Sequence, residues 1–133
     1  MTREEIIEEI TKLKLDKNEF WISGTSALVL RNIIDQANDI DLVITTKLYE
    51  ELNKRIGLTY LGTNHEYKWY KVNDNIECCV EEIKKEKVEI TEPFNLIDLK
   101  YYYDNFLKDS TREKDIKKKE LIKNVLDSYE TII

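Results

Sequence analysis

A glycine turn followed by two alternating aspartates is the feature of this sequence that most constrains its fold. Ser23-Gly24-Thr25-Ser26 comes directly after the apolar residues 20–22, and Asp39-Ile40-Asp41 opens a run that becomes β-branched towards Thr45. Short apolar runs bounded by turn residues indicate strands, and the aliphatic stretch after Ser26 has the length of a helix. We therefore expect a strand, a glycine turn into a helix, and a second strand that begins with two carboxylates.

The composition of the turn suits a phosphate group. Gly24 permits a sharp turn and the close approach of an anion, and the free N–H groups at a helix start favour negative charge. Ser23, Thr25 and Ser26 add hydroxyl groups. A strand-glycine-helix corner is also common as a purely structural element, so the turn alone does not identify a site.

The two aspartates predict a metal site. Residues two apart in a strand face the same side, so Asp39 and Asp41 project together while Ile40 and Leu42 face the opposite way. Paired carboxylates bind hard cations such as Mg²⁺, which also bind substrate phosphates. The alternative is a strand with one polar face, although aspartate is disfavoured in strands.

In this order and spacing, the two motifs resemble the signature of the nucleotidyltransferase superfamily. Residues 20–44 carry the resemblance, which is strongest to the small bacterial and phage-borne branch with the AbiEii-type proteins, and the rest of the chain resembles it only loosely. The resemblance implies that the Ser23–Ser26 turn holds the triphosphate of an NTP and that Asp39 and Asp41 bind Mg²⁺. It also implies a third carboxylate on a later strand.

Glu77 is the best match for that third carboxylate, because Ile76, Cys78 and Val80 supply the opposite, apolar side of its strand. Most proteins of the superfamily have aspartate there. Glu81, on the same strand face four residues on, is the competing candidate. A solvent-facing glutamate is the alternative for either.

The C-terminal part carries a second, weaker resemblance, to a helical segment that lies near the nucleotide in these proteins. It involves residues 96–100 and the run Arg112-Glu113-Lys114-Asp115. On this basis Lys100 binds phosphate as a point charge and Arg112 forms a bidentate contact. Solvated helix charges are the alternative, which we favour for Arg112 and Lys114. Arg31 is either a ligand or the ion-pair partner of Asp35 or of an acidic strand end.

The remaining pattern predicts an α/β fold, a nucleotidyltransferase-like mixed β-sheet flanked by helices. We expect one domain over residues 1–133, with an α/β core (1–92) and a C-terminal helical segment (93–133). Capping-box patterns begin at Thr2 and Ser110, and Gly57 suits a helix end. The expected helices cover residues 2–13, 27–34, 46–55, a segment from Pro93, and 110–132, and the expected strands cover 19–23, 39–45, 59–61, 67–72 and 76–80.

The composition bears on which partners and which compartment the protein is expected to have. With 27 acidic and 21 basic residues the net charge is -6, which gives no general attraction to nucleic acid. No apolar run has the length of a signal peptide or a transmembrane helix. The adjacent Cys78 and Cys79 are poorly placed for a mutual disulfide, and their spacing matches no zinc motif. We expect a cytoplasmic protein with no membrane contact. His65 is expected on a surface turn, and Lys117-Lys118-Lys119 on a solvated helix face.

Together these expectations predict an enzyme that uses magnesium to transfer a nucleoside monophosphate from an NTP to an acceptor. The sequence leaves the acceptor open: an antibiotic, a protein or an RNA. Aromatic residues such as Tyr67 and Trp69 are candidates to flank that acceptor, with packing as the alternative. The rival function is a non-catalytic or partner-dependent interaction module of the same fold, completed by homodimerisation or by another protein. A structural α/β domain with coincidental motifs is the third alternative.

Overall fold

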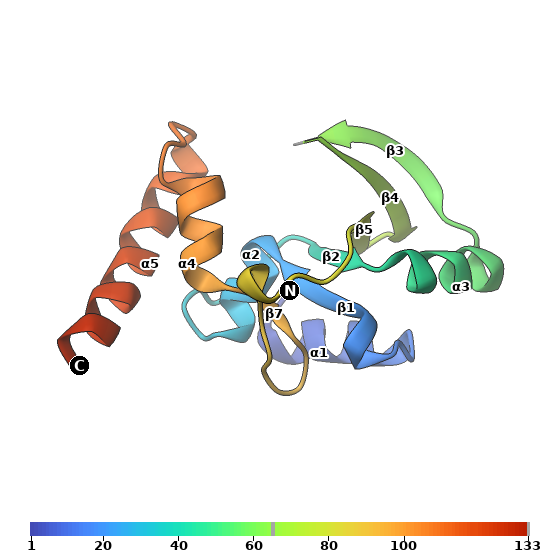
Figure 1. The fold of residues 1–133 in the computed structure, drawn as a ribbon, viewed down its shortest axis with the longest axis horizontal. Helices are drawn as coiled ribbons and strands as arrows, with labels where there is room; N and C mark the ends of the chain where they lie inside the picture. The colour runs from blue at the N-terminus through green and yellow to red at the C-terminus, as the bar shows by residue number, and fades with distance from the viewer. Residues whose placement is uncertain (65, 133) are drawn as a thin grey trace.

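A seven-stranded mixed sheet organises the protein (Figure 1). The computed structural model describes residues 1–64 and 66–132, the last three by their backbone alone. The strand order is β3-β4-β5-β2-β1-β7-β6. The pairs β1–β7 and β2–β5 are parallel and the other four are antiparallel. The strands are β1 (Phe20–Ser23), β2 (Ile40–Ile44), β3 (Thr59–Asn64), β4 (Tyr67–Asn73), β5 (Ile76–Val80), β6 (Val88–Glu89) and β7 (Leu96–Ile97).

Helices flank this sheet, and the predicted α/β fold class is confirmed. Thr2 and Glu5 form the predicted capping box at the start of the first helix, and Gly57 ends the third. The helices are α1 (Arg3–Lys12), α2 (Gly24–Leu30), α3 (Thr46–Ile56), α4 (Leu99–Tyr102) and α5 (Glu113–Ile132); α4 continues into the π-helical η3 (Tyr103–Leu107), and two 3-10 turns are η1 (Lys17–Glu19) and η2 (Lys85–Lys87).

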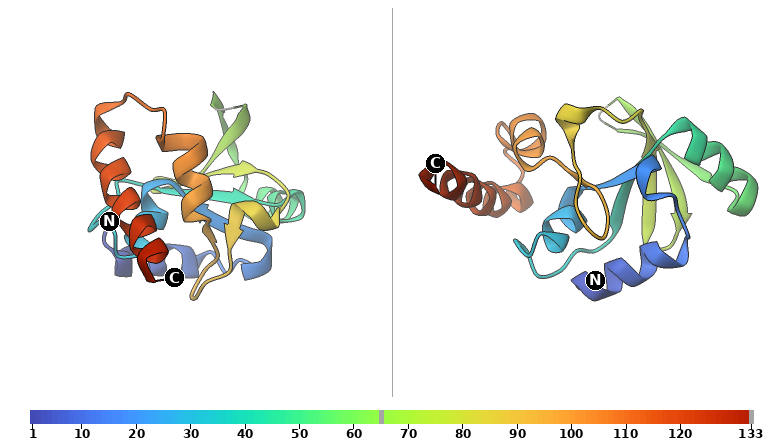
Figure 2. Two further views of the ribbon diagram at one scale, coloured as in Figure 1. Left: turned by 60° about the vertical axis from the view of Figure 1, so that its left-hand side comes forward. Right: turned by 60° about the horizontal axis from the view of Figure 1, so that its bottom comes forward.

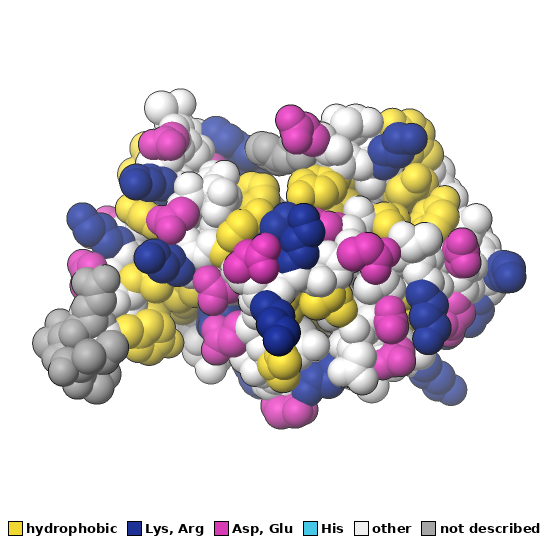
Figure 3. Space-filling model, viewed as in Figure 1, with side chains coloured by type: hydrophobic (Ala, Val, Ile, Leu, Met, Phe, Trp, Pro, Cys, Tyr) yellow, Lys and Arg dark blue, Asp and Glu magenta, His cyan; other side chains and the backbone are white. Residues whose placement is uncertain are grey.

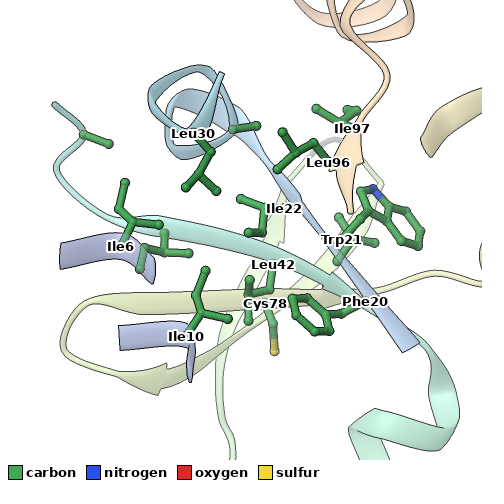
Figure 4. Close-up of a cluster of buried hydrophobic side chains, with 14 of the residues drawn as sticks. Ile6, Ile10, Phe20, Trp21, Ile22, Leu30, Leu42, Cys78, Leu96 and Ile97 are labelled. Atoms are coloured by element: carbon green, nitrogen blue, oxygen red, sulfur yellow. The ribbon is translucent and has the colours of Figure 1, made fainter. Parts of the chain in front are cut away.

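One face of the sheet forms the hydrophobic core. Ile22, Leu42 and Cys78 lie opposite one another on β1, β2 and β5, and none of them is more than 1% exposed. Figure 4 shows Ile6 and Ile10 of α1 beside this row. Fully burying an aliphatic side chain contributes about 1.5–3 kcal/mol, so this row and α1 anchor the central strands.

The opposite face carries the site. Here Trp21, Val43 and Cys79 form the corresponding row, and Figure 4 shows Trp21 on the side of Ile97. The segment from α4 to α5 lies at one end of this face and the β3–β4 hairpin rises at the other, as Figures 1 and 2 show. The ends of the central strands lie between these two arms.

The structure corrects several predicted elements around Pro93. The helix expected from Pro93 begins only at Leu99, where the carboxylate of Asp98 accepts a hydrogen bond from the Tyr101 N–H. The preceding residues instead form β7, which pairs with β1 and with β6, a strand that the sequence pattern did not predict. An apolar run this short has no periodicity that separates a strand from a helix.

Two helix boundaries also differ from the prediction. The second helix begins at Gly24 and ends at Leu30, because Asn32 takes a positive φ of 62° that stops it before Ile34. The predicted capping box at Ser110 is wrong, since α5 begins at Glu113 and the Ser110 hydroxyl donates to Asp115. The sequence pattern locates these helices well but not their ends.

Three further predictions concern the chain's surroundings. In the described part of the chain, no helix is long and apolar enough to cross a bilayer. Cys78 and Cys79 are buried free thiols, and burial raises the pKa of each to about 12, so both stay protonated at neutral pH. His65 lies outside the described residues.

Candidate active site

Three residues from three neighbouring strands form one row at the end of the sheet. Ser23 of β1 lies opposite Asp41 of β2, which in turn lies opposite Glu77 of β5. Asp39 precedes β2 by one residue and projects to the same side as Asp41. The alternation of β2 therefore sends Ile40 and Leu42 into the core and both aspartates to the site.

The carboxylates of Asp39, Asp41 and Glu77 converge. Each offers one oxygen atom, and these atoms all lie within 4.8 Å of one another. Like charges directly opposite in a sheet destabilise it, so the Asp41–Glu77 pair calls for a compensating cation. Oxygen donors at this spacing suit one Mg²⁺ ion or a pair of ions about 3.5–4 Å apart. The donor set therefore fits magnesium.

The pKa of the Asp41 carboxyl is strongly raised. Burial, followed by the charges of Asp39 and Glu77, raises its pKa from 3.8 to about 7, against the opposing effect of Lys114 and Lys118. Because the charged form of Asp41 is disfavoured, any cation that enters the site would stabilise its carboxylate. Shifts of this kind are typical of functional sites.

Gly24 places the turn directly against this carboxylate. Its φ is +65°, in the left-handed region, and a Cβ at this position would lie 2.7 Å from Oδ2 of Asp41. Only glycine satisfies both conditions. Ser23 precedes it as the N-cap of α2 without a side-chain capping bond, and Thr25 follows it at the rim. The turn and the carboxylates thus belong to one site.

A cavity of about 770 Å³ opens above the carboxylates, large enough for a nucleotide-sized ligand. Its floor is the Gly24 turn with the three carboxylates, and the hairpin and the C-terminal helices supply the walls. Figure 3 shows apolar side chains gathered between these two arms. The walls are formed by Leu61–Asn64 and Trp69 on the hairpin side, and by Tyr102, Phe106, Leu107, Ser110, Arg112, Lys114, Asp115 and Lys118 on the helical side.

The helical wall is basic, and buried Asp115 holds it in place. Asp115 accepts a hydrogen bond of 2.7 Å from the Ser110 hydroxyl and lies 3.8 Å from Nζ of Lys118 and 3.9 Å from Nε of Arg112. Lys114, one helical turn before Lys118, faces the same cavity. Three cationic side chains therefore face the carboxylates across the cavity.

Replacing Asp115 with asparagine is expected to lower the free energy of unfolding by about 1–3 kcal/mol, because a buried charged hydrogen-bond acceptor and its pairing with Lys118 are lost. Urea denaturation measures the change. Asp109→Asn, at an exposed position in the turn before α5, is the matched control and should change little. Equal stability of the two variants would contradict the anchoring role of Asp115.

The structure separates the other candidate residues. Glu81 pairs with Lys87 instead of joining the carboxylate cluster, so of the two alternatives it is Glu77 that lies at the site. Lys100 is exposed and does not line the cavity, because it lies on α4 outside the cavity wall. Ser26 is buried and its hydroxyl donates to the Ser23 carbonyl at 3.0 Å, so it does not face the cavity either.

Arg31 takes one of its predicted roles, as the ion-pair partner of an acidic strand end, whereas the lysine run differs from expectation. Arg31 pairs with Glu89 of β6 at 2.9 Å and donates to the Ile97 carbonyl, which ties α2 to the strands beside it. Lys118 is not on a solvated face, since its side chain is 15% exposed and lines the cavity. Its spacing of four from Lys114 was the available signal, because residues four apart share one helix face.

Comparison with known proteins supports the fold. No family model and no curated protein sequence matches the chain. Among solved structures it is similar to the crystal structure of ANT(2″)-Ia, an aminoglycoside nucleotidyltransferase, in complex with adenylyl-2″-tobramycin. The TM-score is 0.56 at 17% identity, over 84% of this chain and 82% of the other. The fold is therefore that of a nucleotidyltransferase, as expected, and the likeness is one of fold alone.

Proposed function

We propose that this protein is a magnesium-dependent nucleotidyltransferase that transfers a nucleoside monophosphate from an NTP to a hydroxyl acceptor. The observation that carries the proposal is the convergence of Asp39, Asp41 and Glu77 beside the Gly24 turn. Two observations support it: these residues line a cavity of suitable size, and the fold is similar to that of a solved nucleotidyltransferase. These carboxylates would hold Mg²⁺, which would supply positive charge against the negative charge that develops during in-line displacement.

In this proposal the triphosphate binds between the Gly24 turn and the basic wall of α5. Gly24 allows phosphate oxygens to approach the backbone, and the hydroxyl groups of Ser23 and Thr25 donate to them. Lys114 and Lys118 approach from the opposite wall. Because the site itself carries three carboxylates, these cations offset the repulsion that an incoming anion meets.

The reaction forms one bond and breaks another at the α-phosphorus. The acceptor oxygen attacks it, the bond to the oxygen bridging to the β-phosphate breaks, and pyrophosphate leaves. The acceptor proton passes to the carboxylate of Glu77, which acts as general base in the floor of the cavity. Asp39 and Asp41 would hold the metal, which would supply positive charge next to the phosphates. The acceptor is one of three classes, an antibiotic, a protein or an RNA.

Magnesium and nucleotide together are expected to stabilise the protein. A ligand at a hundredfold excess over its Kd adds about 2.7 kcal/mol to the free energy of unfolding, so Mg²⁺ with an NTP should raise the thermal midpoint by several degrees. Label from an α-³²P-NTP should then appear in one member of a pool of antibiotics, proteins and RNA. The exchange Lys100→Gln, outside the cavity, should leave both results unchanged.

The outcomes separate the two functions. Thermal stabilisation without label transfer to any acceptor would favour the non-catalytic interaction module, completed by a second copy or another protein. No stabilisation with any of the four NTPs would overturn the proposed function altogether. Thermal stabilisation reports nucleotide binding and label transfer reports catalysis, so the two functions are tested by separate measurements.

A further inference from the structure

A second, smaller cavity adjoins the first on the same face of the sheet. Its volume is about 60 Å³, and since one water takes about 10–15 Å³ in the same measure, it has room for roughly four to six waters. That is enough for one edge of a flat heterocycle, whose remaining ring atoms would lie in the larger cavity. Ser23, Trp69 and Phe106 line both cavities. We call this smaller cavity the aromatic slot, lined by Trp21, Ser23, Val43, Tyr67, Trp69, Cys79, Glu81, Lys87, Ile97, Tyr101 and Phe106.

The sheet register places the slot directly behind the carboxylates. Trp21, Val43, Cys79 and Trp69 form the next row along the strands after the row of Asp41 and Glu77. Glu81 follows β5 and continues the ladder, since its N–H donates to the Ile44 carbonyl at 2.9 Å. Glu77 and Glu81 are four residues apart, or about 13 Å along a strand. This span compares with that of a nucleoside from its 5′-phosphate to the far edge of its base.

The lining of the slot contains two charged side chains beside its aromatic ones. Glu81 and Lys87 form an ion pair there, with each side chain 15% exposed. Nζ of Lys87 also lies 5.5 Å from the ring centroid of Tyr101. The hydrogen bond from Lys87 to Glu81 raises the pKa of the lysine, so the lysine stays charged at neutral pH. A buried ion pair adds little to stability over apolar residues, and specificity for a ligand is a stronger reason for its presence.

We propose that the aromatic slot receives the hydrogen-bonding edge of the nucleobase of the NTP, where Glu81 and Lys87 read it, while the rest of the base lies against Trp69 and Phe106 at the junction of the two cavities. This inference rests on the proposed function, because the phosphates must lie at the carboxylates for the base to reach the slot. Aromatic faces stack on any base. Selection among bases falls to the polar pair: Glu81 accepts from an amino or ring N–H group, and Lys87 donates to a neighbouring ring nitrogen or carbonyl oxygen.

The tryptophans of the chain make the slot directly observable. The protein has two, Trp21 and Trp69, and both line the slot. With Mg²⁺ present, an NTP that stacks there should change the tryptophan fluorescence and bind roughly ten- to a hundredfold more tightly than inorganic tripolyphosphate, given the usual strength of base stacking. Tripolyphosphate should stabilise the protein without the fluorescence change.

A variant tests the polar pair. Glu81→Gln keeps the size of the side chain but loses the negative charge, so the order of preference among the four NTPs should change by roughly tenfold or more. Its affinity for tripolyphosphate should stay the same, which a purely structural role would not predict. Glu86→Gln, at an exposed position in η2, is the matched control.

The two proposals fail differently. Equal affinity for NTP and tripolyphosphate, with no fluorescence change, would overturn the nucleobase slot and leave the proposed function standing. If neither ligand binds with Mg²⁺, the proposed function fails, and the slot with it. The fluorescence comparison uses the unaltered protein, so it decides the question even where the Glu81→Gln chain does not fold.

Discussion

Replacing Asp41 with asparagine is expected to abolish nucleotidyl transfer and, at the same time, to make the metal-free protein more stable above neutral pH. The variant loses the carboxylate shared by the metal site and the Gly24 turn. A metal ion supplies several kcal/mol of transition-state stabilisation, and each 1.36 kcal/mol is tenfold in rate. Pyrophosphate release in the presence of the acceptor should therefore fall by about a thousandfold or more.

The gain in stability follows from the raised pKa of Asp41. Its folded-state pKa is about 7 against 3.8 in an unperturbed chain. Below pH 3.8 the carboxyl is protonated in both the folded and the unfolded state, and its contribution to the free energy of unfolding is fully present. As pH rises towards 7, only the unfolded state has released the proton, so the free energy of unfolding falls until the folded-state carboxyl ionises as well. The variant, which cannot ionise, escapes this loss.

Above neutral pH the Asp41→Asn variant should exceed the unaltered protein by roughly 2–4 kcal/mol in free energy of unfolding, at 1.36 kcal/mol per unit of pKa shift. Denaturation in urea with a chelator, from acid to alkaline pH, measures the difference and should show it vanish at the acid end. Glu51→Gln, on the exposed side of α3, should show no such dependence. A variant no more stable than its parent at alkaline pH would contradict the electrostatic account of the site.

The sequence specified the floor of the site because local rules act there. Alternation along one strand is enough to put Asp39 and Asp41 on one side and Ile40 in the core. The glycine turn needs only its neighbours in the chain. Glu77 is different: its alternation was visible, but only the parallel pairing of β5 with β2 puts it rather than Glu81 beside Asp41.

The walls of the site depend on contacts between distant segments, which no local pattern contains. Lys118 looked like part of a solvated lysine run, and its position is set by how α5 packs beside η3 and by Asp115. Lys100 had the right charge for a phosphate ligand but lies on the wrong side of α4. Likewise β7 was invisible as a strand, because its extended form depends on pairing with Ile22 of β1.

Replacing Gly24 with alanine is the second change expected to have a large effect, and Gly57 provides its matched control. Both glycines have a positive φ, +65° at Gly24 and +70° at Gly57. An L-residue in this conformation costs roughly 1–2 kcal/mol, and both alanine variants share that loss. They differ in space: a Cβ at Gly24 would lie 2.7 Å from Oδ2 of Asp41, whereas a Cβ at Gly57 meets nothing within 4 Å.

This difference isolates the role of the turn in the active site. Gly57→Ala should lower the free energy of unfolding by about 1–2 kcal/mol and leave nucleotide binding and transfer intact. Gly24→Ala must push the Asp41 carboxylate away from Asp39 and Glu77, so the binding of Mg²⁺ with an NTP should disappear even under conditions where the variant is folded. Circular dichroism establishes the fold, and nucleotide-induced thermal stabilisation reports the binding. If both alanine variants bind nucleotide equally well, the contact between the turn and Asp41 is not part of the site. The phosphate-binding turn and the metal-binding carboxylates would then be two independent sites, because Gly24 is where the turn contacts Asp41.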